Sequence, residues 1–392
     1  MSDALILDAT RTPWGKFGGA LRDYSAAELA SHLIQTLVQR DQIDPAAVDD
    51  VILGQVLQGG AGQAPARQAA IGGGLPVTTP ALLINKVCGS GMRAVSLASQ
   101  LIRLDEADLI FAGGMESMTS APYYDMDTRW GARMGNRSLV DGMVHDGLWC
   151  AFDDVHMATQ GDTMATCREI SREEMDGWSL VSQQRWGKAF RRGYFDREIT
   201  PVPSKRDPNH RALSRDENPR PDSTPEGLAR LKPVYNTRAI TPGNAPAVND
   251  GAAVLLLASE EGAGRAGLKP LARIIGHAES AVKPSEYPIA PAHAIRKLLH
   301  KAGVTLDDVA VIEVNEAFAA VPLIVGQELT WDSDRVNRCG GAVAVGHPIG
   351  ASGARLVLTA AYQLQEIGAR YALAAICSGS GQGDAVLLEA VS

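Results

Sequence analysis

Apolar and polar positions follow a helical period in two segments of the chain that align with each other. The segment starting at Gly89, GSGMRAVSLASQLIRLDEADLIFAGG, aligns without a gap with ASGARLVLTAAYQLQEIGARYALAAI, which starts at Ala351. In each segment a Gly/Ser turn precedes an amphipathic helix, and a short apolar run followed by a glycine-rich loop comes next. The pattern therefore predicts a helix, a buried strand and a loop, twice.

The first predicted helix has two faces of different character. Its apolar face carries Val95, Ala98, Leu101 and Ile102, and its polar face carries Arg93, Ser96, Gln100 and Arg103. Buried strands are expected at 109–112 and 371–376, and strand-like openings recur at Ala4 and Leu271. We therefore predict an α/β fold of two similar halves packed about a pseudo-twofold axis.

A proline-rich segment separates the two halves. Prolines recur from Pro201 to Pro246, which argues against long regular elements. We predict a loop-rich insertion domain over 120–248. The N-terminal core half is then 1–119, completed by 249–270, and the C-terminal core half is 271–392.

Composition excludes some classes of protein. The 392 residues are 45% hydrophobic and 21% charged, as in folded globular proteins, and the net charge of −8 argues against nucleic-acid binding by the whole surface. Charge is uneven, because Arg185–Arg238 holds 13 Lys+Arg against 7 Asp+Glu. This basic segment is either a solvated, salt-bridged surface or a landing surface for a phosphorylated small molecule.

Cysteine use and hydropathy indicate the compartment. The odd number of cysteines and the absence of a secretion signal in MSDALILDAT favour a reducing, cytoplasmic location. No apolar run approaches the ~18 residues of a membrane span, so no membrane partner is expected.

Neither CxxC nor a short Cys/His spacing is present, so no metal site is expected. Cys150, Cys167 and Cys339 are interpreted as packing residues.

Four side chains lie where ligands of α/β sheets bind, at helix starts and strand ends. Cys88 precedes the first repeated helix, whose dipole and free N–H groups favour a thiolate nucleophile, although a buried inert cysteine also fits. His347 precedes the second repeated helix, and we interpret it either as a general base or as a structural histidine. Cys377 ends the last apolar run beside a glycine-rich loop, as an acid/base thiol. Asn315 and the adjacent Glu316 lie at the end of another strand-like run. We interpret Asn315 either as a helix cap or as a site residue.

Five sequence blocks resemble the signature blocks of thiolases. They are NKVCGSGMRAV around Cys88, GGMESM at Gly113, NEAFAA at Asn315, GGAVAVGHPIGASGAR around His347, and the final CSGSGQGDA. They occur in the family's order over nearly the whole chain. The resemblance implies the duplicated thiolase fold with a loop domain, and coenzyme A thioesters as substrates. The basic segment would then meet the nucleotide phosphates.

The resemblance also implies residue roles. Cys88 accepts the acyl group, His347 activates it, and Cys377 moves the proton at the substrate α-carbon. Asn315 holds a water that stabilises the enolate together with His347. The backbone N–H groups of Cys88 and Gly379 receive the tetrahedral oxyanion.

Further motifs resemble those of the short-chain acetoacetyl-CoA thiolases. DGL and VHMA imply a substrate pocket lined by Leu148, His156 and Met157, with Phe318, Arg220 and Pro246 as further substrate- or CoA-binding positions. RWGARMGNRS resembles the loop by which those enzymes form tetramers, which implies a homotetramer, a dimer of dimers. Two positions depart from the family pattern: Ser380 replaces a glycine, and Pro246 stands where many relatives have serine.

The expected activity is the reversible condensation of two acetyl-CoA molecules to acetoacetyl-CoA and CoA, with CoA as substrate and product and no tightly bound cofactor. A degradative 3-ketoacyl-CoA thiolase acting on longer or bulkier chains is the alternative. A non-catalytic acyl-CoA-binding protein of the same fold is a third possibility, because fold does not fix function.

Overall fold

The computed structural model describes residues 2–206 and 212–391, and most of its strands form one mixed sheet. The strands are β1 (Ala4–Arg11), β2 (Gly15–Lys16), β3 (Asp50–Gly54), β4 (Ala81–Ile84), β5 (Leu109–Ser117), β6 (Tyr123–Tyr124), β7 (Val140–Asp141), β8 (Trp149–Cys150), β9 (Val155–His156), β10 (Asn249–Ala258), β11 (Ala272–Ala281), β12 (Val309–Val314), β13 (Tyr371–Ser378) and β14 (Gln382–Glu389). The α-helices are α1 (Ala26–Arg40), α2 (Pro65–Gly72), α3 (Ser90–Arg103), α4 (Met157–Cys167), α5 (Arg172–Arg191), α6 (Pro225–Ala229), α7 (Glu260–Ala266), α8 (Ala290–Ala302), α9 (Ala320–Leu329), α10 (Ala342–Val345) and α11 (Ser352–Ile367).

The sheet repeats one arrangement on either side of its centre. Its order is β12-β13-β14-β11-β1-β10-β5-β3-β4, so β1, β10, β5 and β3 correspond to β11, β14, β13 and β12. β1 and β11 meet antiparallel at the centre, with Ala4 opposite Ile274. β3 runs parallel to β5, and β12 runs parallel to β13. The prediction of two similar α/β halves is confirmed.

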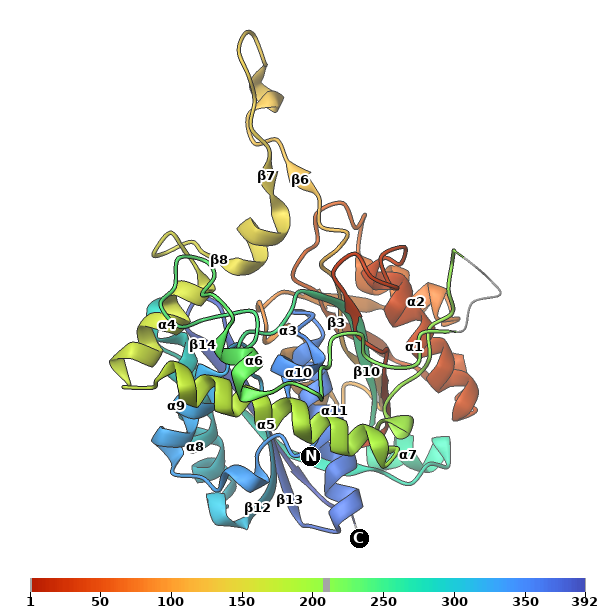
Figure 1. Cartoon of the computed structure of the whole chain (residues 1–392). Helices are drawn as coiled ribbons and strands as arrows, with labels where there is room; N and C mark the ends of the chain where they lie inside the picture. Colours follow the sequence, from red (N-terminus) through yellow and green to blue (C-terminus); the bar gives the residue numbers. More distant parts are fainter. Residues whose placement is uncertain (1, 207–211, 392) are drawn as a thin grey trace.

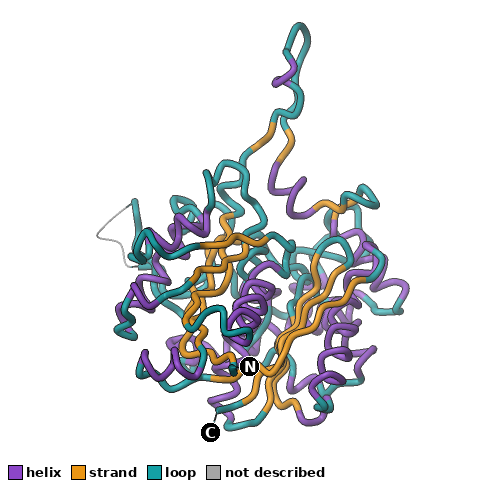
Figure 2. Tube along the Cα trace, turned by 180° about the vertical axis from the view of Figure 1, so that it is seen from behind, coloured by secondary structure: helices purple, strands orange, loops and turns teal. Residues whose placement is uncertain are grey.

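The two repeated helices, α3 and α11, pack against each other. Figure 2 shows helices between the two groups of strands. Aligned glycines permit this close approach: a Cβ on Gly91 would lie 2.8 Å from the carbonyl oxygen of Gly350, and one on Gly353 would lie 2.5 Å from the backbone nitrogen of Met92. α3 is covered on both sides, so Ser96, expected on a polar outer face, is buried.

The segment 120–248 is more regular than its composition suggests. It contains α5, the longest helix of the described residues, with 20 residues. Ser171 and Glu174 form a capping box at the start of this helix. The proline argument holds for the described part of 201–246, where α6 is the one α-helix, but α5 lies before Pro201 and is a long regular element that the prediction of a loop-rich segment did not foresee. Pro208, one of the prolines in that argument, lies outside the described residues.

A narrow arm projects from the body of the molecule at β6 and β7 (Figure 1). These two strands pair with each other and with no other strand. Between them Trp130 is 88% exposed and Met134 is 97% exposed. Large apolar side chains exposed on such an arm are unusual on a monomer surface.

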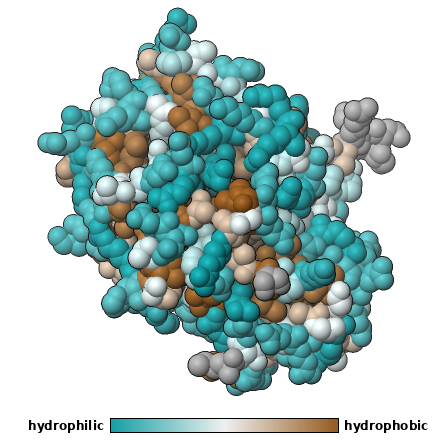
Figure 3. All heavy atoms as spheres, turned by 90° about the horizontal axis from the view of Figure 1, so that it is seen from below, coloured by the Kyte–Doolittle hydropathy of each residue, from teal (hydrophilic) through white to brown (hydrophobic). Residues whose placement is uncertain are grey.

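No helix among residues 2–206 and 212–391 is both long and apolar enough to cross a membrane. On the face seen in Figure 3, hydrophilic residues predominate and hydrophobic residues form separate patches.

Candidate active site

The turn between β4 and α3 carries Cys88 in a strained backbone. Val87 has a φ of +48°, which β-branched residues rarely adopt. The Ser90 hydroxyl donates to the Val87 carbonyl oxygen at 2.6 Å and accepts from the backbone N–H of Lys86 at 2.8 Å. These bonds hold the turn, and Cys88 lies directly before α3, as the sequence predicts.

His347 lies in the turn before α11, the helix that corresponds to α3, and it is 7% exposed. Its Nδ1 lies 2.6 Å from the Oγ of Ser352, and its Nε2 lies 3.3 Å from the Nδ2 of Asn315. Its backbone N–H donates to Oδ1 of Asn249 at 3.0 Å. The ring and its backbone are therefore held by three separate side chains.

Cys377 lies near the end of β13 and is buried. The loop that follows it brings the backbone N–H of Gly379 to the thiol of Cys88, which also meets its own backbone N–H. Two N–H donors thus converge beside the same sulfur, which is the geometry that a tetrahedral oxyanion needs. Cys88 and Cys377 are both free thiols.

These groups open onto one cavity of about 430 Å³. The predicted site residues that line it are Cys88, His347, Cys377, Gly379, Leu148, His156, Met157, Arg220, Pro246 and Phe318. Asn315 does not line it but lies behind His347. The tertiary structure therefore brings together residues that are up to 291 positions apart, from Cys88 to Gly379.

One wall of the cavity is a stacked pair that the sequence analysis did not anticipate. The rings of His156 and Tyr235 lie 4.0 Å apart between centroids, at an interplanar angle of 7°. The His156 Nδ1 accepts the backbone N–H of Ala158 at 3.1 Å, which caps α4. The stack and the cap together fix the imidazole plane against the cavity.

The resting site is uncharged at its reacting atoms. Burial raises the pKa of Cys88 to about 12 and that of Cys377 well above its ordinary value. Burial also lowers the pKa of His347 to about 3, and the positive charge of Arg355 adds to this. The backbone N–H groups at the helix start lower the pKa of Cys88, as expected, but desolvation outweighs them and leaves the pKa raised. Cys88 needs a base to remove its proton.

Two buried glutamates lie near the site, and one of them, Glu116, was missed by the sequence analysis. Glu116 accepts backbone N–H groups of Val56, Leu57 and Gly350, and burial raises its pKa to about 7. It ties the loop after β3 to the turn that follows His347. The sequence signal was a carboxylate within the otherwise apolar strand β5, because an ionisable group in a fully buried strand needs hydrogen-bond or charge partners.

Glu316 is the second of these carboxylates. It accepts hydrogen bonds from Trp178 Nε1, Ser182 Oγ, Asn337 Nδ2 and the backbone N–H of Val343. It therefore anchors the residue after Asn315 to α5 of the insertion. Its position beside Asn315 in NEAFAA was the available signal.

The remaining cysteines differ from one another. Cys150 and Cys339 are buried, as expected of packing residues, but Cys167 is exposed at the end of α4. The packing interpretation of Cys167 is wrong, because the helix presents its last residue to solvent. Among the described residues no cluster of three His, Cys, Asp or Glu side chains could hold a metal ion.

The basic segment Arg185–Arg238 divides into two parts. Within its described residues Arg220 is the cation that lines the cavity. Others form ion pairs with carboxylates outside the segment: Arg185 with Asp334, Arg192 with Glu366, and Lys205 with Glu28. These side chains form a salt-bridged surface. A binding surface for a phosphorylated small molecule is therefore restricted to the surroundings of Arg220. Arg211 lies outside the described residues.

Ser380 occupies a backbone conformation that suits glycine. Its φ is +68°, in the left-handed region, which costs a non-glycine residue ~1–2 kcal/mol. We expect Ser380→Gly to raise the free energy of unfolding by up to about 1 kcal/mol, since the greater freedom of glycine in the unfolded chain offsets part of the gain. Urea denaturation measures this.

The neighbouring glycine provides the contrast. Gly381 has a φ of +76°, and a Cβ there would lie 2.5 Å from the carbonyl oxygen of Val282. Gly381→Ala should therefore destabilise the protein. A lower urea midpoint for Ser380→Gly would show that the hydroxyl contributes more than the backbone strain costs.

Comparison with known families agrees with this geometry. Residues 4–261 match the family domain described as "Thiolase, N-terminal domain", and residues 268–390 match "Thiolase, C-terminal domain". The chain belongs to the thiolase family. It is a thiolase-fold enzyme over nearly its whole length. The first match ends at the start of α7, and the second begins before β11.

Individual thiolase relatives cover the chain almost completely. It is 47% identical over 390 residues to "Probable acetyl-CoA acetyltransferase" of Escherichia coli (strain K12), covering 99% of each chain. It is 47% identical over 390 residues to "Acetyl-CoA acetyltransferase" of Pseudomonas aeruginosa, again covering 99% of each. The crystal structure of the Bacillus anthracis acetyl-CoA acetyltransferase superposes with a TM-score of 0.97 at 40% identity, covering 100% of this chain and 99% of that one.

Proposed function

We propose that the protein catalyses the reversible Claisen condensation of two acetyl-CoA molecules to acetoacetyl-CoA and CoA through an acyl-cysteine intermediate. The observation that carries the proposal is the convergence of Cys88, His347 and Cys377 on one cavity, with the N–H groups of Cys88 and Gly379 directed at one sulfur. The names of the relatives support acetyl-CoA as the substrate.

Acyl transfer comes first. Nε2 of His347 takes the proton of Cys88, whose sulfur attacks the acetyl-CoA carbonyl carbon. The N–H groups of Cys88 and Gly379 stabilise the oxyanion. The C–S bond to CoA then breaks, and the departing CoA sulfur takes the proton of Cys377. The products are CoA, acetyl-Cys88, a Cys377 thiolate and an imidazolium at His347.

Condensation restores the starting state. The Cys377 thiolate takes the α-proton of a second acetyl-CoA, and the enolate oxygen is stabilised by the His347 imidazolium and a water held by Asn315. Oδ1 of Asn315 is buried and has no partner among the described residues, which suits such a water. The enolate carbon attacks acetyl-Cys88, and the released Cys88 sulfur recovers its proton from His347.

The other lining residues shape the pocket. Leu148, Met157 and Phe318 supply apolar walls for a short acyl chain, and the stacked His156 closes one side. Arg220 meets the CoA phosphates, whereas Pro246 offers no side-chain hydrogen bond. CoA serves as substrate and product, and no tightly bound cofactor takes part.

A chain-length series of 3-ketoacyl-CoA substrates, assayed for thiolysis, tests the proposal. Acetoacetyl-CoA should give the highest kcat/KM, because the relatives carry the name acetyl-CoA acetyltransferase. Faster turnover of longer substrates would favour a degradative 3-ketoacyl-CoA thiolase. Binding of acyl-CoA without turnover would indicate a non-catalytic acyl-CoA-binding protein.

Arg220→Ala should raise the KM for acetyl-CoA roughly tenfold with little change in kcat, since a hydrogen bond to a charged group is worth ~1.5–3 kcal/mol. The KM of the unmodified protein should also rise with ionic strength. Lys205→Ala is the matched control, because Lys205 pairs with Glu28 away from the cavity. A salt-independent KM that Arg220→Ala leaves unchanged would contradict this role.

Assembly, compartment and domain division complete the proposal. The exposed Trp130 and Met134 of the arm support a homotetramer built as a dimer of dimers. The need for two free thiols supports a reducing, cytoplasmic location. The return of β10 to pair with β1 and β5 supports 249–270 as the completion of the 1–119 half, with 120–248 as the loop domain and 271–392 as the second half.

A further inference from the structure

We propose that Ser352 is a positioning residue for His347. It holds the imidazole in the tautomer that carries its proton on Nδ1, which leaves Nε2 as the base, and it supports the imidazolium when that base is protonated. The inference deepens the proposed function and rests on its assignment of His347 as the base.

The hydrogen bonds of Ser352 favour one direction for this contact. Its hydroxyl has one proton, which is donated to the carbonyl oxygen of Pro348 at 2.9 Å. The same oxygen lies 2.6 Å from Nδ1 of His347. A hydroxyl proton given to Pro348 leaves the oxygen free to accept the proton of Nδ1, and this is the direction that we assign to the contact. Ser352 is 0% exposed, so water does not compete for this position.

Asn315 meets the opposite nitrogen but is less selective. Its Nδ2–H donates to Nε2, which agrees with an unprotonated Nε2. Its Oδ1 has no partner among the described residues, so rotation of the amide would let it accept a proton from Nε2 equally well. Asn315 therefore follows the tautomer of His347, and Ser352 sets it.

The internal repeat places an equivalent serine beneath the nucleophile. The alignment that pairs Gly89 with Ala351 also pairs Ser90 with Ser352, and each is the first residue of its helix. The Ser90 hydroxyl fastens the turn that carries Cys88. The two related serines thus hold the turns of the nucleophile and of the base.

The hydrogen bond with Ser352 matters most when the His347 ring is an imidazolium. A protonated ring has two N–H groups, and Ser352 is the acceptor that the described residues offer to Nδ1. Arg355 disfavours the positive charge, and its partner Glu313 binds Arg355 at 2.9 Å rather than the ring. Without the serine oxygen, a buried N–H would be left unpaired.

The test compares Ser352→Ala with Ser179→Ala. Ser179 is also fully buried and donates to the carbonyl four residues before it, at 2.7 Å, but it contacts no histidine. The readouts are kcat and KM for acetyl-CoA, the thermal midpoint, and the rate at which iodoacetamide alkylates Cys88 at pH 7, followed by mass spectrometry of the Cys88 peptide.

We expect Ser352→Ala to lower kcat and the Cys88 alkylation rate roughly 10- to 100-fold, the range that one unpaired buried donor implies. KM should change by less than about twofold, because Ser352 does not line the cavity. Ser179→Ala should lower the thermal midpoint to a similar extent and leave both rates unchanged.

A folded Ser352→Ala protein with unchanged kcat and alkylation would overturn the proposal and leave Ser352 a structural residue. Should Ser352→Ala not fold, Ser352→Cys replaces it, since a thiol has similar volume and is a weak acceptor. An alkylation rate several-fold lower supports the proposal, and an unchanged rate overturns it. Alkylation needs no acetyl-CoA, so this arm still tests Ser352 if the unmodified protein fails to condense acetyl-CoA.

Discussion

Cys377→Ala should still accept an acetyl group on Cys88 from acetyl-CoA but should lose condensation by roughly 10²–10⁴-fold, the contribution typical of a general base. Acylation needs His347 and the two N–H donors, and a thiolate leaving group departs without the proton of Cys377. Enolate formation needs a base at the α-carbon. His347 and Cys88 are engaged in acylation, and the other imidazole that lines the cavity, that of His156, is stacked on Tyr235. Mass spectrometry after brief incubation with labelled acetyl-CoA should find acetyl-Cys88 accumulating.

Two further variants test this prediction, one with a different expected defect and one as a control. His347→Ala should impair acylation itself, because the pKa of Cys88, about 12, leaves little thiolate at neutral pH. Cys150→Ala is the matched control, since Cys150 is buried but does not line the cavity, and both activities should persist. Label on Cys377 alone would reverse the roles of the two cysteines, and near-normal condensation by Cys377→Ala would remove it from the mechanism.

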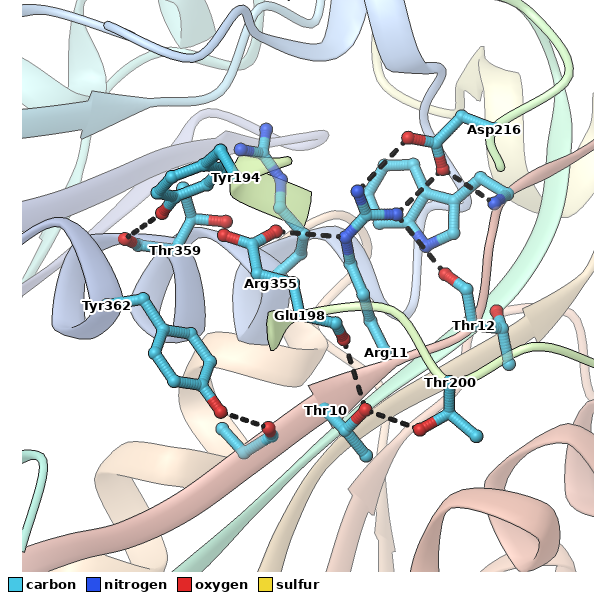
Figure 4. A network of polar contacts seen from close by, with 12 residues as sticks. Thr10, Arg11, Thr12, Tyr194, Glu198, Thr200, Asp216, Arg355, Thr359 and Tyr362 are labelled. Atoms are coloured by element: carbon cyan, nitrogen blue, oxygen red, sulfur yellow. Dashed lines mark hydrogen bonds and ion pairs between the residues drawn. The ribbon is translucent and has the colours of Figure 1, made fainter. Parts of the chain in front are cut away.

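The second large effect concerns stability. Arg11, at the end of β1, is buried and binds Asp216 through both terminal nitrogens, at 2.7 and 3.0 Å, and Glu198 through Nε at 3.2 Å (Figure 4). Asp216 also accepts the backbone N–H of Trp14 at 2.8 Å. The network joins the first strand of the core to the segment that leads to Arg220.

Arg11→Met should lower the free energy of unfolding by about 3–5 kcal/mol, because it leaves the buried carboxylates of Glu198 and Asp216 without their cation. It should also raise the KM for acetyl-CoA, since the segment that carries Arg220 loses its attachment to β1. Urea denaturation followed by circular dichroism measures the first effect, and steady-state kinetics measures the second.

Lys205→Met breaks a solvent-exposed pair with Glu28 and should cost less than about 1 kcal/mol. If Arg11→Met is no more destabilising than Lys205→Met, water reaches the two carboxylates in the variant and the network contributes little. That outcome would also predict an unchanged KM.

The sequence alone determined the duplicated architecture. Local patterns carry this information, because the helical period of α3 and α11 and the apolar runs of β5 and β13 are properties of neighbouring residues. The same holds for the positions of Cys88 and His347 before paired helices. The thiolase motifs then supplied roles that periodicity could not.

Only the tertiary structure decided the electrostatics and the support of the site. The helix start favours a Cys88 thiolate, but burial, which depends on distant elements, outweighs this effect and raises the pKa of Cys88. The ion pairs of Arg185 and Lys205, the Glu116 contacts and the bond from Ser352 to His347 likewise join groups whose meeting depends on packing. A sequence pattern indicates which face of a helix or strand is buried. The desolvation of a side chain on that face and its hydrogen-bond partners depend on which distant segments pack against it.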